Sequence, residues 1–198
     1  MGQILGQILV GDLPFQCNHC SGRNSHDSDC TQRLVPCPLA YNQRPCDQSF
    51  KFANFLRDFE SSHGKLPVME NGASVTTGLL ANDFEWDRRD YFTFGVKIEA
   101  YGRVFISSSF TMDGVYYEWV KLLGTPSEAK DFIFSLEYKG SGSTHVYLGK
   151  VASIDETLTE VLLDAKCSSI GFEVFKRQFM EGNTSKYHWS TTIKRLDE

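Results

Sequence analysis

The stretch that decides the fold runs from residue 104 to residue 140 and reads VFISSSFTMDGVYYEWVKLLGTPSEAKDFIFSLEYKG. Its residues alternate with a period of two on both sides of Asp113-Gly114, which predicts a hairpin of two strands. A further alternating run ends at Gly140, and others follow in residues 143–148 and 187–193. Seven or eight strands at hairpin spacing predict a mainly β protein, an antiparallel sandwich or barrel.

Helical signals are few and short. Phenylalanines at helical spacing predict a helix over residues 50–62 with one apolar face. Thr125-Pro126-Ser127-Glu128 is a capping box, which predicts a helix of about two turns. Ser153 or Asp155 is expected to open a third helix, and residues 170–174 alternate as another strand.

Composition limits the classes of function. The chain has 198 residues, 41% of them hydrophobic, and a net charge of -5. This acidic balance argues against a mainly nucleic-acid-binding role. The sequence lacks the long apolar run of a membrane span and the basic start of a secretory signal, so we expect a cytoplasmic protein, with the nucleus as the alternative. We expect a lead-in over residues 1–16, a Cys/His segment over 17–66 and a β domain over 67–198.

Five of the six cysteines fall within the first 46 residues, and this clustering beside histidines suggests zinc. Two sets of four potential ligands have suitable spacing. The first set is Cys17, Cys20, His26 and Cys30, and the second is Cys37, Cys46, Asp58 and His63. For the second set two interpretations stay open, a zinc site or a metal-free remnant in which Asp58 is a solvated helix residue. Cys167 is expected to be a buried apolar residue.

The motifs of familiar enzyme classes are missing from the sequence. It contains no G-x-S-x-G, no H-E-x-x-H and no glycine-rich phosphate loop. Both potential zinc sets use four protein ligands, which leaves no open position for catalysis. The residues therefore favour an interaction protein.

The chain resembles the seven-in-absentia (Siah/Sina) family in three segments. HDSDCTQRLVPCP at residues 26–38 is similar to the junction between that family's two zinc fingers, and Cys46 through His63 has the spacing of the last three ligands of its second finger. WVKLLGTPSEAKDFIFSLEYKG at residues 119–140 resembles the family's strand–helix–strand signature. The helix and trailing cysteine of residues 153–167 also fit.

The resemblance implies tandem zinc fingers, with up to two zinc ions, followed by a TRAF-like eight-stranded β-sandwich. Family members are RING-type ubiquitin ligases that direct proteins to proteasomal degradation. Their sandwich dimerises and binds extended degradation signals (degrons) by strand addition. The chain begins about where the family's linker into the first finger lies and shows no RING, so the resemblance leaves ligase activity open.

The resemblance also points to residues of a peptide-binding groove. Asp90-Tyr91 falls where the family has an Asp-Trp pair, Thr93 would share the sheet face of Tyr91, and Met69 is a further candidate on the preceding segment. The alternative is that Tyr91 and Thr93 are ordinary sheet residues. We expect a substrate-recognition module of the ubiquitin system that forms a homodimer, or a heterodimer with relatives. The alternative function is a non-enzymatic, RING-less dimerisation partner that regulates full-length relatives.

Overall fold

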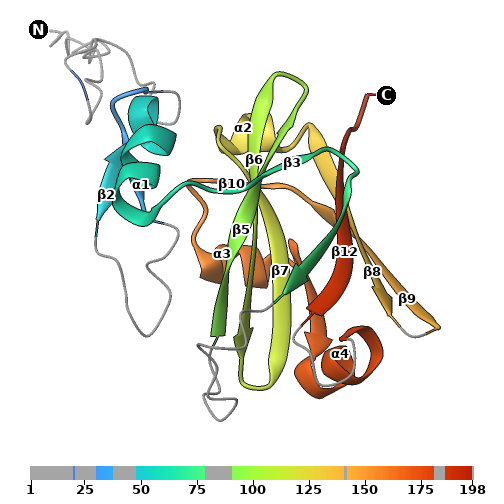
Figure 1. Ribbon diagram of the computed structural model, residues 1–198. Helices are drawn as coiled ribbons and strands as arrows, with labels where there is room; N and C mark the ends of the chain where they lie inside the picture. The colour runs from blue at the N-terminus through green and yellow to red at the C-terminus, as the bar shows by residue number, and fades with distance from the viewer. Residues whose placement is uncertain are drawn as a thin grey trace, which may run out of the picture.

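The computed structural model describes residue 20 and residues 30–37, 48–78, 91–140, 142–180 and 186–197. About half of these residues lie in two mainly antiparallel sheets that pack face to face (Figure 1). The larger sheet contains β3 (Val68–Glu70), β5 (Tyr91–Ala100), β6 (Arg103–Met112), β7 (Val115–Leu122), β10 (Ala152–Ser153) and β11 (Cys167–Gly171). The smaller sheet has the order β4 (Ser74–Gly78), β12 (Lys186–Arg195), β8 (Phe132–Gly140) and β9 (Ser143–Lys150).

The hairpin predicted around Asp113-Gly114 is present as β6 and β7. Asp113 and Gly114 both have positive φ, which is the backbone geometry that a tight hairpin turn requires. The described part of the chain has six strands in one sheet and four in the other, rather than eight, because short strands such as β3 and β10 extend the larger sheet. Both of these short strands pair in parallel with their neighbours.

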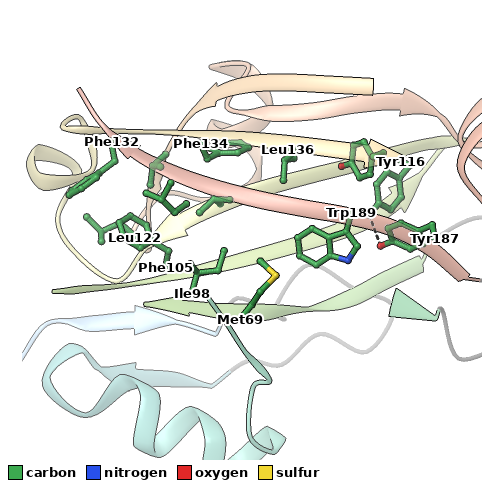
Figure 2. Packing of buried hydrophobic residues seen from close by; sticks show 14 of the residues in the cluster. Met69, Ile98, Phe105, Tyr116, Leu122, Phe132, Phe134, Leu136, Tyr187 and Trp189 are labelled. Carbon is green, nitrogen blue, oxygen red and sulfur yellow. Dashed lines mark hydrogen bonds between the residues drawn. The ribbon is translucent and has the colours of Figure 1, made fainter. Parts of the chain in front are cut away.

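The sandwich core lies between the two sheets, where alternate residues of each strand point inward. Figure 2 shows Ile98, Phe105 and Leu122 of the larger sheet opposite Phe134, Leu136 and Trp189 of the smaller one. Helix α4 (Phe172–Phe179) covers one end of this core, where Phe175 stacks on Tyr116 with ring centroids 4.3 Å apart. Many of the aromatic residues of the chain therefore pack in this core.

Two sequence expectations about local structure are wrong. Residues 172 and 174 lie in α4 and not in a strand, because Phe172, Phe175 and Phe179 recur at helical spacing and the last two are buried. Helix α3 (Leu158–Leu163) begins after Thr157, whose hydroxyl accepts a hydrogen bond from the Glu160 amide, and not after Ser153 or Asp155. Helix α2 (Pro126–Ala129) has the predicted capping box but is only four residues long.

A ββα unit precedes the sandwich. It contains the hairpin of β1 (Leu34–Pro36) and β2 (Ser49–Lys51), a short 3-10 helix (Phe52–Asn54) and α1 (Phe55–His63). Phe50, Phe55 and Phe59 fill its interior, and the same apolar cluster includes Ile106 and Ile154 of the sandwich side. The unit and the sandwich therefore share a packed joint.

Arg33 fastens this joint by electrostatic contacts. Its guanidinium donates to the Asp155 carboxylate through Nε and Nη2, at 3.1 Å for the Nη2 contact, and it lies 3.6 Å over the Phe52 ring. The Arg33 side chain is only 5% exposed, so this is a largely buried contact between segments 122 residues apart in sequence. Among the described residues no helix is long and apolar enough to cross a membrane.

Candidate functional site

Strand β5 offers an edge to which another strand could be added. On one side β5 pairs with β6 along its length, from Tyr91 opposite Thr111 to Ala100 opposite Arg103. On the other side the described residues supply only β3, which pairs with Lys97–Glu99. Within the part of the chain that the structure describes, the segment from residue 91 to residue 96 therefore has one sheet neighbour, and its second edge can accept main-chain hydrogen bonds.

A β-bulge shapes the same segment. The register of β5 against β6 shifts between Thr93 and Val96. Gly95 lies so close to the Ser107 backbone that a Cβ placed on it would be 1.3 Å from the Ser107 carbonyl oxygen. Only glycine can be accommodated this close to another backbone, so the bulge depends on Gly95. The bulge changes the direction of the part of β5 that precedes it.

The structure places the predicted groove residues unevenly. Tyr91 and Thr93 occupy β5 register positions opposite Thr111 and Ser109, two positions apart and therefore on one face. Met69 lies in β3, where it is 5% exposed and packs in the sandwich core, so it presents little surface to a partner in this conformation. Asp90 lies outside the described residues.

Two members of the second Cys/His set meet in the ββα unit. The Sγ atom of Cys37, just after β1, is 3.4 Å from Nε2 of His63, the last residue of α1. Zinc bonds of about 2.3 Å to sulfur and about 2.1 Å to nitrogen, at a tetrahedral angle, place two ligand atoms about 3.6 Å apart. The pair thus has the spacing of two ligands of one zinc ion, and the ring of Phe59, 4.9 Å from that of His63, helps to hold the imidazole.

Asp58 does not join this pair in the structure. Its carboxylate accepts a hydrogen bond from Arg57 Nε at 2.9 Å and is 39% exposed. His63 is five positions further along the helix, which turns the two side chains about 140° apart around the helix axis. Among the described residues no group of three or more potential ligands is assembled. Cys20 and Cys30 are described, whereas Cys17, His26 and Cys46 lie outside the described residues.

A buried carboxyl group lies inside the sandwich, near the bulge of β5. Glu118 of β7 accepts hydrogen bonds from Ser107 Oγ at 3.0 Å, Tyr116 Oη at 3.0 Å and Tyr138 Oη at 2.8 Å. The hydroxyls of Tyr116 and Tyr187 are 3.1 Å apart, as the dashed line in Figure 2 shows. We call these five residues the Glu118 cluster, and it links β6 and β7 of one sheet to β8 and β12 of the other.

Burial dominates the electrostatics of this cluster. Removal from water raises the pKa of Glu118 to about 7, although hydrogen bonds from Tyr138, Tyr116 and Ser107 favour the charged form. Burial, and then the neighbouring Glu118 carboxylate, raises the pKa of Tyr116 and of Tyr138 well above the ordinary tyrosine value. Glu118 is not among the site residues predicted from the sequence. The available signal was an acidic residue at an inward position, in step with Tyr116 and Val120.

Comparison with known proteins finds a similarity for the sandwich. Residues 96–188 match the family model described as the Sina, TRAF-like domain. None of the curated proteins compared with the chain matches it. The match covers the sandwich from the second half of β5 to the start of β12, and it includes the Glu118 cluster. It begins after Asp90, Tyr91 and Thr93 and does not extend to the ββα unit.

Proposed function

With a Sina-type TRAF-like domain as the starting point, we propose that this chain is a substrate-recognition module of the ubiquitin–proteasome system that binds extended degron peptides. The match to the Sina, TRAF-like domain suggests that this chain has a substrate-binding or interaction role. The observation that carries the finer proposal is the β5 edge over residues 91–96, which has one sheet neighbour among the described residues. Strand addition at such an edge gains affinity from main-chain hydrogen bonds, and neighbouring side chains supply specificity.

The proposal gives separate roles to the groove residues. Tyr91 and Thr93 share one face of β5, and we assign them contacts with alternate side chains of the bound peptide. Asp90, the preceding residue in the sequence, is assigned a polar contact with the peptide. Met69 of β3 is assigned a supporting role, because its side chain is buried in the core.

A binding assay tests this function. Fluorescence anisotropy with a labelled extended degron peptide should detect binding to the full chain, and Tyr91→Ala and Thr93→Ala should each weaken it about tenfold. Val146→Ala is the matched control, because Val146 is an exposed residue on β9 at the edge of the other sheet. Absence of binding, or equal loss in the control, would count against the module.

We also propose that the Cys/His segment holds structural zinc. Cys37 and His63 would be ligands of one ion with Cys46 and Asp58, and Cys17, Cys20, His26 and Cys30 would hold another. The 3.4 Å spacing of Cys37 Sγ and His63 Nε2 supports the first assignment. In such closed sites zinc stabilises the fold and performs no catalysis.

Zinc stoichiometry of the purified chain tests the metal assignment. We expect Cys37→Ser and His63→Ala each to remove one zinc ion per chain, measured by elemental mass spectrometry. Cys167→Ser is the control, because Cys167 lies in β11 of the sandwich. Asp58→Asn separates the two interpretations of the second set. Loss of zinc supports Asp58 as a ligand, and full retention of zinc excludes Asp58 as a ligand. Dimerisation and location in the cytoplasm or nucleus stay predictions from the resemblance.

A further inference from the structure

The Glu118 cluster touches the part of β5 where the described residues show an interruption of strand pairing. Glu118 Oε1 accepts a hydrogen bond from Ser107 Oγ, and the Ser107 backbone is the surface against which Gly95 packs. Ser107 therefore connects the bulge between Thr93 and Val96 to the buried carboxyl group of Glu118.

The elements that surround Glu118 differ in how extensively they are paired and packed. On the smaller-sheet side, β8 is paired on both edges, with β9 and with β12. At the end of the core, Phe175 and Phe179 of α4 pack against Tyr138. On the β5 side, the described residues give the segment before Val96 only one paired neighbour, and a bulge breaks its register. Water that solvates an ionised Glu118 would enter most easily through β5.

We propose that Glu118 is a proton-controlled latch, which holds the first half of β5 against β6 when it is neutral and lets that half open to water when it is ionised. An ionised carboxylate in a buried site gains free energy by hydration, and local opening provides that hydration. A neutral carboxyl group has little to gain from water and stays within the cluster.

Other titratable groups face Glu118 and could imitate this effect. Tyr116 of β7, Tyr138 of β8 and Tyr187 of β12 surround it, and burial keeps the pKa of Tyr116 and Tyr138 far above neutral pH. His145 of β9 stacks on Tyr138 with ring centroids 5.9 Å apart, so it is the histidine that a control variant must replace. On α4 the charges of Glu173 and Lys176 pair with each other at 2.6 Å.

Amide hydrogen exchange of the full chain, followed residue by residue from pH 5 to pH 8, tests the latch without any binding partner. After correction for intrinsic exchange rates, the protection of those amides within residues 91–96 that bond to β6 should fall by up to about tenfold per pH unit toward pH 7 and then level off. Amides of Ser135 and Leu136 in the doubly paired β8 report global unfolding, which has its own dependence on Glu118, and they should be more strongly protected than the β5 amides at every pH.

Two variants complete the experiment. Glu118→Gln keeps a hydrogen-bonding side chain of similar shape and should make the protection of amides 91–96 independent of pH. His145→Asn should keep the wild-type pH profile. Equal protection of β5 and β8 amides at every pH in the wild type would mean that β5 opens only through global unfolding, and this would overturn the latch, as would an unchanged β5 profile in Glu118→Gln. If Glu118→Gln does not fold, the wild-type comparison of the two strands still decides the matter.

Discussion

Glu118 gives the stability of the whole sandwich a pH dependence of defined sign. Its pKa is about 7 in the folded chain against an ordinary value of 4.5, because burial penalises the charged form. A folded-state pKa above the unfolded value means that folding takes up a proton between these two pH values. The stabilising contribution is therefore complete below about pH 4.5 and is lost as pH rises to about 7.

We expect the Glu118 contribution to the free energy of unfolding to fall by about 3 kcal/mol between pH 4.5 and pH 7.5. Urea unfolding of wild type and Glu118→Gln at a series of pH values measures this difference. Glu99→Gln is the matched control, because Glu99 pairs with Lys97 at the surface and is 60% exposed. Parallel pH profiles for wild type and Glu118→Gln would show that the buried carboxyl group does not titrate in this range.

Among the elements, the turn before α2 depends on one hydroxyl group. Thr125 Oγ1 accepts from the Glu128 amide at 3.2 Å, and Glu128 Oε2 accepts from the Thr125 amide at 2.8 Å. This second contact, followed by the ion pair with Arg103, lowers the pKa of Glu128. Thr125→Ala removes the cap and should cost about 1 kcal/mol of unfolding free energy in urea titrations. Thr125→Ser should recover most of that loss, and similar losses in both variants would contradict the role of the hydroxyl.

Elements could be predicted from the sequence where one local signal acts alone. The hairpin at Asp113-Gly114 and the capping box at Thr125 are correct because turn and cap chemistry are fixed by neighbouring residues. Residues 172–174 were misassigned because Ile170, Phe172 and Val174 also alternate, and the helix depends on burial of Phe175 and Phe179 against the distant Tyr138. A period of two over so few residues cannot be separated from one face of a helix.

For the molecule as a whole, the parts of the site that depend on long-range contacts could not be predicted from the sequence. Spacing alone suggested Cys37 and His63, and the structure brings them together. No local pattern indicated that Gly95 would lie against Ser107, or that Glu118 would face three tyrosines from both sheets. These contacts exist only after the sheets have formed and packed.

The joint between the ββα unit and the sandwich also depends on residues that are far apart in the sequence. Arg33 and Asp155 are far apart in sequence, yet their two side chains are 5% and 25% exposed in a contact that closes the joint. Breaking a largely buried ion pair leaves one charge without compensation, so Arg33→Ala should cost about 3 kcal/mol in urea unfolding. Arg57→Ala is the matched control. Its pair with Asp58 is 72% and 39% exposed, and its removal should change the unfolding free energy by less than about 0.5 kcal/mol.

The same variants show whether this contact holds the two parts of the molecule together. The connection between α1 and β3 contains Lys65, which is exposed and offers trypsin a cleavage site. If the Arg33 contact keeps the ββα unit docked, native Arg33→Ala should be cut there faster than wild type, because an undocked unit frees the connecting backbone for the protease. Arg57→Ala should be cut at the wild-type rate. Equal rates in all three chains, together with equal unfolding free energies, would mean that the apolar contacts of Ile106 and Ile154 hold the joint without Arg33.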